Sequence, residues 1–342
     1  MRIVQIVPRL APPFEGVGSF AQGLAGALLD GPGIASHLLA AGPGAPGTAP
    51  DARALAARLE REAGADPVLL HYVGYGYQPR GCPRWLVDGL AAWKAGGSRR
   101  LVTLFHEVYA SGPPWRSSFW LSPAQRRLAA RLSALSDGRV TSLALYRRAL
   151  LRQQPGLDVA VLPVFSTVGE PAAVSPLAAR AHRMVIFGGA GVRARAYQRQ
   201  AQGLAEACRA LGLDEVWDVG PPGNAAPPAE VAGRPLRRLG ELPAAQVHAL
   251  LGESLAGFVA YPPRFLAKST VFAAYCAHGM LPLCGALAPD DDEDDEVPPF
   301  WQPNRQPAAP EELQALTDQA RTWYRSHTAA VHAALYRELL SP

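Results

Sequence analysis

The sequence contains little cysteine and no long apolar run. Its four cysteines, Cys82, Cys208, Cys276 and Cys284, form no CxxC pair. This usage argues against a disulfide framework or structural zinc and favours free thiols in a reducing compartment. The opening MRIVQIVPRL leads directly into a strand-like run without a signal-peptide h-region, and no apolar stretch is long enough to cross a membrane. We therefore expect a soluble, cytoplasmic protein.

Charge is also sparse. Charged residues make up 18% of the chain, and 33 basic against 29 acidic residues leave a net charge of +4. Because no stripe of Lys and Arg interleaved with aromatics stands out, we expect no nucleic-acid partner. The balance is compatible with an anionic ligand or with peripheral contact at an anionic membrane surface. The one acidic block, Asp290–Glu296, is expected to be a solvated loop rather than a metal site, because adjacent like charges resist packing.

The glycine fingerprint of dinucleotide-binding enzymes is missing. The loop PPFEGVGSF after the first strand-like run carries Gly16 and Gly18 but no third glycine, and no acidic residue closes a second strand. This argues against an oxidoreductase or epimerase of the Rossmann type. The segment Gly16, Val17 and Gly18 still allows a ligand to approach the backbone, and Ser19 can cap the helix that follows. Alternatively, it is only a tight structural turn.

What the chain does contain is a regular alternation of short β-branched runs and amphipathic Ala/Leu-rich segments. With 342 residues, 49% of them apolar, it is long enough for two cores. The alternation predicts βα units around parallel sheets. Expected strands cover Arg2–Val7, Val68–Tyr72, Leu101–Phe105, Arg139–Thr141, Val159–Val164, Met184–Phe187, Glu215–Val219, Gly257–Tyr261 and Leu281–Cys284. Expected helices cover Ser19–Leu29, Pro123–Leu135, Leu143–Gln153, Tyr197–Leu211, Ala244–Leu251, Ser269–His278 and Glu311–Leu340.

The alternation runs through two halves, which predicts an α/β fold of two doubly wound Rossmann-like domains that face a central cleft. The Pro/Ala-rich stretch Ser166–Arg180 is the expected linker. We therefore expect one domain over 1–168 and another over 180–310. Ligands bind at the carboxyl ends of strands in such sheets, so the loops after strands are the candidate sites.

In the first half, polar and aromatic residues follow two strands. His106 and Glu107 come directly after Leu101–Phe105, where a histidine could bond a sugar hydroxyl or move a proton. Alternatively, His106 only caps the strand and is held by Glu107. His71, Tyr72 and Tyr75 lie at the end of the preceding strand and could contact an acceptor. A packed tyrosine-rich loop explains them equally well.

In the second half, basic residues follow two strands. Arg193 and Arg199 stand beside Gly188, Gly189 and Gly191, a combination suited to a diphosphate because guanidinium groups bind phosphate bidentately. Lys268 precedes a helix start at Ser269 and Thr270, whose backbone N–H groups can receive phosphate oxygens. Solvated arginines at a helix start are the competing interpretation.

These loops, in this order and over nearly the whole chain, resemble the retaining GT-B glycosyltransferases. The resemblance implies that the loop Gly16–Gly18 approaches the donor diphosphate and that His106 contacts the donor sugar. It further implies that Arg193 or Arg199 together with Lys268 neutralises the diphosphate, and that Gly240, Glu241 and Leu242 read the base. A closing helix, over about 320–342, would return to the first domain.

One departure from that family concerns two glutamates eight positions apart, which flank the phosphate-binding turn. Here Leu266 and Ala274 occupy those positions. Their absence bears on the choice of base and sugar and identifies a divergent branch.

The resemblance implies a hexosyltransferase that moves a sugar, with retention, from a nucleotide sugar to an acceptor glycan or small molecule. UDP is the favoured base, and neither a metal nor another cofactor is required. The alternative is a catalytically weak GT-B relative that binds a nucleotide or glycan as a partner subunit.

Overall fold

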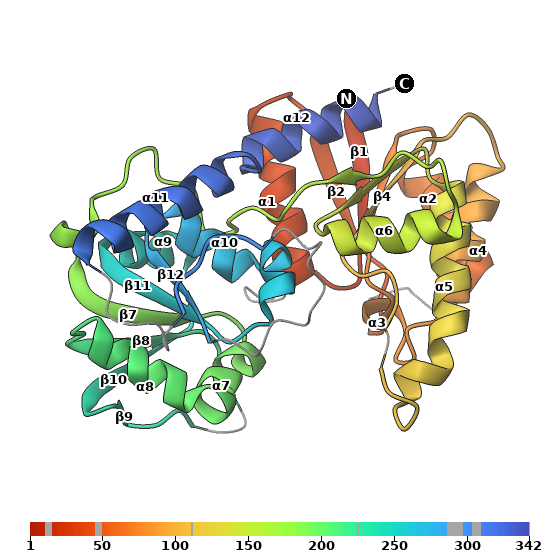
Figure 1. The fold of residues 1–342 in the computed structure, drawn as a ribbon. Helices are drawn as coiled ribbons and strands as arrows, with labels where there is room; N and C mark the ends of the chain where they lie inside the picture. Colours follow the sequence, from red (N-terminus) through yellow and green to blue (C-terminus); the bar gives the residue numbers. More distant parts are fainter. Residues whose placement is uncertain are drawn as a thin grey trace. The chain divides into compact units, whose positions relative to one another are not determined.

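The structure, a computed structural model, describes residues 1–10, 16–44, 50–110, 112–223, 226–285, 297–302 and 309–341. The acidic block Asp290–Glu296 lies outside these residues. The chain divides into two compact units, which we call unit 1 (Met1–Pro163 with Ala329–Pro342) and unit 2 (Val164–Thr328). Each unit contains a largely parallel sheet with helices packed against it (Figure 1).

The sheet of unit 1 has six parallel strands in the order β2-β1-β3-β4-β5-β6. Its strands are β1 (Arg2–Val7), β2 (Ala35–Ala40), β3 (Val68–Tyr72), β4 (Leu101–Phe105), β5 (Gly138–Thr141) and β6 (Ala160–Val161). The order in which strands are added to the sheet changes direction between β1 and β3, and we call this position the switch point of the sheet. Ligands of α/β proteins bind at the carboxyl ends of the strands beside a switch point.

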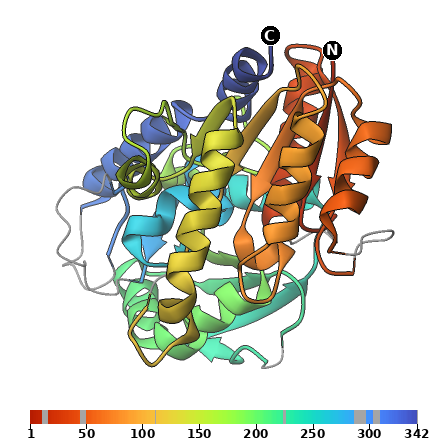
Figure 2. The ribbon, with the colours of Figure 1, turned by 90° about the vertical axis from the view of Figure 1, so that its right-hand side faces the viewer.

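Helices of unit 1 cover both faces of this sheet (Figure 2). They are α1 (Gly16–Asp30), α2 (Ala52–Glu62), α3 (Gly74–Tyr77), α4 (Arg84–Lys94), α5 (Ser117–Leu135), α6 (Ala144–Gln153) and α12 (Ala329–Leu340). Apolar residues of α2, α4 and α5 form one core with Val4, Leu70 and Phe105. Because side chains alternate along a strand, Gln5 and His71 point to the other face, which α1 covers.

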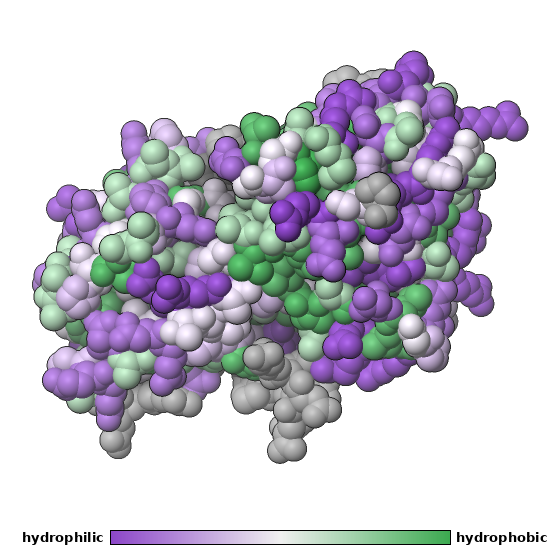
Figure 3. All heavy atoms as spheres, turned by 90° about the horizontal axis from the view of Figure 1, so that it is seen from above, coloured by the Kyte–Doolittle hydropathy of each residue, from purple (hydrophilic) through white to green (hydrophobic). Residues whose placement is uncertain are grey.

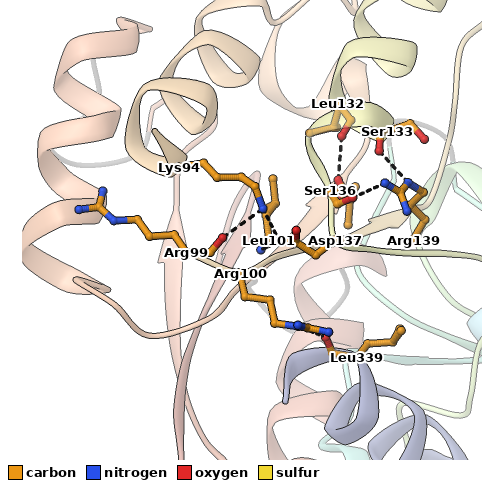
Figure 4. A network of polar contacts seen from close by, with 11 residues as sticks. Lys94, Arg99, Arg100, Leu101, Leu132, Ser133, Ser136, Asp137, Arg139 and Leu339 are labelled. Carbon is orange, nitrogen blue, oxygen red and sulfur yellow. Dashed lines mark hydrogen bonds and ion pairs between the residues drawn. The ribbon is translucent and has the colours of Figure 1, made fainter. Parts of the chain in front are cut away.

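At the amino ends of β4 and β5, a polar network holds unit 1 together (Figure 4). Lys94 pairs with Asp137, whose carboxylate also accepts from the Leu101 amide at 2.8 Å. Arg100 donates to the carbonyl oxygen of Leu339 at 2.6 Å. Helix α12 is thereby fixed to the start of β4.

The sheet of unit 2 has the order β12-β11-β7-β8-β10-β9 and is parallel except for the pairing of β9 with β10. Its strands are β7 (Ala181–Phe187), β8 (Glu215–Val219), β9 (Glu230–Val231), β10 (Arg234–Gly240), β11 (Ser254–Val259) and β12 (Leu281–Cys284). Its helices are η1 (Leu177–Ala179), α7 (Ala190–Arg199), α8 (Ala201–Ala210), α9 (Ala244–Glu253), η2 (Pro263–Lys268), α10 (Thr270–Ala277) and α11 (Pro310–Arg325). The order in which strands are added changes direction between β7 and β11, which is the switch point of this sheet.

Tyr275 holds the middle of the unit 2 sheet. Its buried hydroxyl accepts from the Phe187 amide at 3.1 Å and contacts the carbonyl oxygens of Val185 at 3.1 Å and Phe258 at 3.3 Å. The ring fits because residue 257 is glycine, where a Cβ would lie 2.4 Å from the ring. Helix α10 is therefore held to β7 and β11, the two strands at the switch point.

Large hydrophobic residues are mostly buried, and some remain exposed. Figure 3 shows hydrophobic and hydrophilic residues interspersed on the face that is seen from above the view of Figure 1. Among the residues that the structure describes, no helix is both long and apolar enough to span a membrane.

Candidate functional site

The carboxyl ends of β3 and β4 in unit 1 bring two histidines together. His71 is wholly buried near the end of β3, and His106 directly follows β4. Their rings are stacked with centroids 5.4 Å apart, and His71 Nδ1 lies 3.1 Å from His106 Nε2. Phe20 of α1 packs edge-on against both rings. Both lie at the carboxyl edge of the sheet, with His71 on β3 at the switch point and His106 one strand farther, and this edge is where a ligand site is expected.

Hydrogen bonds continue behind His71 through Gln5 to Ser36. Gln5 Oε1 lies 2.8 Å from His71 Nε2, and the Gln5 amide nitrogen donates to Ser36 Oγ at 2.9 Å. Burial lowers the pKa of His71 to about 3, so the ring is neutral near pH 7. A neutral imidazole has one donor and one acceptor nitrogen. With the amide in this orientation, His71 donates from Nε2 and accepts at Nδ1.

The direction of this chain determines which proton His106 carries. Since His71 Nδ1 is an acceptor, the Nε2 of His106 must donate to it. In its neutral form His106 then has Nδ1 as its acceptor atom. The relay Ser36–Gln5–His71–His106, which we call the histidine relay, selects one tautomer of the last ring. Sequence reasoning missed Gln5, because nothing local marks a glutamine in an apolar strand as a partner of residue 71.

Buried histidines make the stability of the chain depend on pH. Burial lowers the pKa of His71 to about 3, and of His278 and His332 to about 4. The unfolded chain has histidine pKa values near 6.5, so it takes up protons first as the pH falls. We expect the free energy of unfolding to be constant above about pH 6.5 and to fall below it. Each of the three rings should contribute up to about 1.4 kcal/mol per pH unit.

Urea unfolding between pH 7 and pH 5 measures this slope, in a range where most carboxylates stay ionised. In His332→Gln this slope should be smaller by up to about 1.4 kcal/mol per pH unit, the contribution of one proton. The fold should be kept, because the amide can still donate to the Pro163 carbonyl oxygen that His332 Nε2 contacts at 2.8 Å. An unchanged slope in this variant would show that His332 is not neutral in the folded chain.

The other expected residues of unit 1 divide into core and surface. Tyr72 is 1% exposed and its ring packs edge-on against Phe105, so we assign it to the core and withdraw it from the expected acceptor site. His71 is equally inaccessible and can act only through His106. Tyr75 is 41% exposed and accepts a bond from Gln125 at 3.1 Å. Its place at the surface keeps it available to an acceptor.

Glu107 and the segment Gly16–Gly18 are the other expected site residues of unit 1. The amide of Glu107 lies 3.4 Å from the Tyr72 carbonyl oxygen, next to the bond from the His106 amide at 3.0 Å. Residues Gly16, Val17 and Gly18 form the start of α1, with Gly18 buried. The preceding part of that loop, residues 11–15, lies outside the described residues.

In unit 2, the start of α10 follows β11 at the switch point. Ser269 caps this helix by accepting from the Phe272 amide at 3.2 Å, and Thr270 is its first residue. The ammonium of Lys268 lies 5.5 Å from the centre of the Phe265 ring and is partly exposed. A cation beside a helix amino terminus favours a phosphate group.

Arg193, which the sequence favoured for the diphosphate, makes its contacts inside unit 2. Its guanidinium is buried, forms an ion pair with Asp218, and donates to the carbonyl oxygens of Gly188 and Pro221. Tyr197 donates to the same carboxylate. Because these contacts hold the guanidinium inside the fold, we assign Arg193 to the structure of unit 2 and withdraw it from the diphosphate site.

Two other arginines of α7 remain accessible. Arg199 is exposed at the last turn of the helix. Arg195 lies with its guanidinium 5.6 Å from the centre of the Tyr261 ring, directly after β11, and its Nε is buried without a hydrogen-bond partner among the described residues. An unpaired charged donor at the switch point is a stronger phosphate candidate than Arg193. The sequence alone gave no means of ranking the arginines of α7 as phosphate ligands.

The expected base-reading residues lie at the carboxyl end of β10. Gly240 has a φ of 68°, which favours glycine, and its carbonyl oxygen accepts from the Gly220 amide at 2.8 Å. Glu241 and Leu242 follow before α9, with Glu241 exposed. Their positions place backbone groups at the same edge of the unit 2 sheet as Lys268.

The positions of the two missing glutamates are apolar and closed. Leu266 is fully buried, and Ala274 is 1% exposed within α10. Within the described ranges, no group of three or more His, Cys, Asp or Glu side chains could hold a metal ion.

Comparison with known proteins shows the fold. No protein-family model and no curated protein sequence matches the chain. Among solved structures, it is similar to an alpha-glucosyltransferase in complex with UDP and DNA (TM-score 0.63, 11% identity, 100% of both chains covered). It is also similar to the alpha,alpha-trehalose 6-phosphate synthase of Burkholderia multivorans (TM-score 0.57, 12% identity, 99% and 98% covered). The S. aureus MnaA–UDP structure is a third (TM-score 0.53, 11% identity, 99% and 97% covered). The predicted GT-B fold, with two Rossmann-like domains, is confirmed.

Proposed function

We propose that this GT-B chain transfers a sugar from a nucleotide-sugar donor, with UDP-sugar as the first candidate, to an acceptor glycan or small molecule. The observation that carries the proposal is the histidine relay, which ends in a tautomer-selected His106 at the carboxyl edge of the unit 1 sheet. Similar structures that hold UDP support the choice of nucleotide. Retention of configuration and hexose specificity are part of the proposal by resemblance.

Sugar transfer from a nucleotide donor requires little covalent catalysis by the protein. As the glycosidic bond breaks, negative charge accumulates on the leaving diphosphate, and preorganised cations and dipoles stabilise it. We assign this task in unit 2 to Lys268, the amino terminus of α10 and Arg195, with Arg199 as an outer cation. His106 of unit 1 orients the donor sugar through its Nδ1, since its Nε2 bonds His71.

The competing function is a nucleotide- or glycan-binding subunit with weak catalysis. The closed apolar positions Leu266 and Ala274 favour it, because a carboxylate that would hold a ribose or sugar hydroxyl is missing at both. Turnover separates the two functions: binding of a nucleotide sugar without release of nucleoside diphosphate in the presence of acceptors would support the weak subunit.

The acceptor is open to direct test. The similar alpha-glucosyltransferase was solved with UDP and a 13-mer DNA that contains a HMU base. We expect no nucleic-acid acceptor for this chain, and we expect glycan or small-molecule acceptors to be modified instead. Incubation with labelled UDP-glucose and either duplex DNA or a glycan mixture, followed by detection of labelled product, distinguishes them.

Nucleotide affinity should depend on Lys268. In calorimetric titrations with UDP, GDP and ADP, we expect one nucleotide to bind and Lys268→Ala to weaken that binding by about 10- to 100-fold, as for a lost charge-assisted hydrogen bond. The matched control is Arg209→Ala, an exposed arginine in the last turn of α8. If Lys268→Ala bound like the wild type, the phosphate site at α10 would be wrong.

A further inference from the structure

Three large aromatic side chains stand out of unit 1 at one place. Trp115 is 83% exposed, Trp120 is 70% exposed and Phe119 is 43% exposed. They lie in and just before the first turns of α5, which extend past the carboxyl ends of the unit 1 strands (Figure 1). Large apolar side chains that gather at one exposed place mark interaction sites. We call residues 115–127 the aromatic tip.

The charge around the tip is of one sign. From residue 108 to residue 136 the sequence has no Asp or Glu and four arginines. Arg131 pairs with Asp88 at 2.7 Å, while Arg116, Arg126 and Arg127 are exposed. The segment therefore presents a net positive charge beside its aromatic rings.

Helical geometry puts one of the rings and one of the arginines on the same side of α5. Ser122, Gln125, Leu128, Ala129 and Leu132 form the buried side of α5. Trp120 and Arg127 are seven positions apart, two helical turns, and share the opposite side about 10 Å from one another along the axis. Aromatic rings occupy the end of the helix and cations lie behind them, as in segments that meet a membrane surface.

Trp120 makes its polar and ring contacts within the aromatic tip or directly before it. Trp120 donates its indole N–H to the carbonyl oxygen of Pro114 at 2.8 Å, and its ring packs edge-on against Phe119. A satisfied N–H removes one cost of moving an indole into an apolar layer. The arrangement is a projecting helix end, so a flat surface fits it better than a narrow ligand.

We propose that the aromatic tip docks on an anionic lipid surface, with the rings at the level of the headgroups and Arg116 and Arg127 on the lipid phosphates. Such binding joins burial of apolar surface to attraction by anionic lipids. The proposal goes beyond sugar transfer and does not depend on it: the tip contains none of the residues assigned to the donor.

Vesicle co-sedimentation tests the docking. The full chain should bind vesicles of equimolar phosphatidylcholine and phosphatidylglycerol, bind phosphatidylcholine alone far more weakly, and lose affinity as salt is raised. Trp115→Ala with Trp120→Ala should lower the partition coefficient by about tenfold or more, and Arg116→Glu with Arg127→Glu should abolish the preference for anionic vesicles. Leu29→Ala, an equally apolar residue that is 57% exposed elsewhere in unit 1, is the control and should change nothing.

Several outcomes would overturn the proposal. Equal binding to neutral vesicles, or binding to neither kind, excludes an anionic lipid surface. If the tryptophan variant instead loses a concentration-dependent dimer seen by sedimentation without lipid, the tip joins two copies of the chain. If a labelled oligonucleotide binds and competes with vesicles for the tip, the partner is nucleic acid. Unchanged circular dichroism of the variants shows that loss of binding is not loss of folding.

Discussion

Replacing His106 with alanine should lower the rate of sugar transfer by about 100-fold while the affinity for nucleotide stays within a few-fold of the wild type. A positioned histidine that orients or exchanges a proton with a reacting group contributes rate differences of this size. Nucleotide contacts are assigned to unit 2, so they should survive the change. The measurement is release of nucleoside diphosphate from the donor with acceptor present, paired with calorimetric titration.

The matched control is His182→Ala, which removes an exposed histidine from β7. A rate for His106→Ala within threefold of the control would remove His106 from the site. Simultaneous loss of nucleotide affinity would show that the residue contributes to donor binding as a whole rather than to the sugar.

The relay behind His106 can be separated from the residue itself. Gln5→Leu takes away the acceptor of His71 Nε2, so His71 can take the other tautomer and His106 should become a mixture. Gln5→Glu keeps an acceptor there and should restore the wild-type tautomer. Nitrogen-15 spectra of the His106 ring report this directly, and a merely structural role for Gln5 would leave the tautomer unchanged.

Replacing Asp218 with alanine should lower the free energy of unfolding of unit 2 by about 3–5 kcal/mol. The change leaves the Arg193 guanidinium, which is 5% exposed, without its carboxylate partner inside the fold. It also removes the acceptor of the Tyr197 hydroxyl. A buried charge without a partner is among the most destabilising defects that a single substitution can create. Urea unfolding followed by circular dichroism measures the loss.

An exposed ion pair supplies the control. Arg131 and Asp88 are both about half exposed, and Asp88→Ala should cost at most about 1 kcal/mol. The cycle with Arg193→Met and Asp218→Leu should show that the double change costs less than the sum of the two single changes. Additive costs would mean that the guanidinium and the carboxylate do not depend on one another, and Arg193 could again be considered as a phosphate ligand.

The buried parallel strands were predictable. Strands Arg2–Val7, Val68–Tyr72, Leu101–Phe105 and Glu215–Val219 were expected with the bounds that the structure has. Each is a short run rich in β-branched and aromatic residues, because a strand covered on both faces is mostly apolar. The alternation of such runs with amphipathic segments was enough to predict two Rossmann-like domains, and the resemblance of the loops added the GT-B assignment.

The elements that sequence reasoning missed lie at sheet edges or depend on context. Strand β2 is partly exposed and β10 carries three arginines, so neither reads as an apolar run. Helix α5 begins at Ser117 rather than at Pro123, which it contains in its interior. The expected helix Glu311–Leu340 is two helices, α11 and α12, that end in different units. Local periodicity does not reveal a break between two segments of the same helical pattern.

The sequence by itself determined where chemistry could be, because residues that directly follow buried parallel strands must gather at one edge of a sheet. It determined in this way the placement of His106 after β4 and of Lys268 near the start of α10. Only the tertiary structure decided which side chains are available there. Arg193 is paired with Asp218, Tyr72 points into the core, and Gln5 bonds His71 on the neighbouring strand. These contacts join residues far apart in the chain. Their partners are set by packing, which no local pattern encodes.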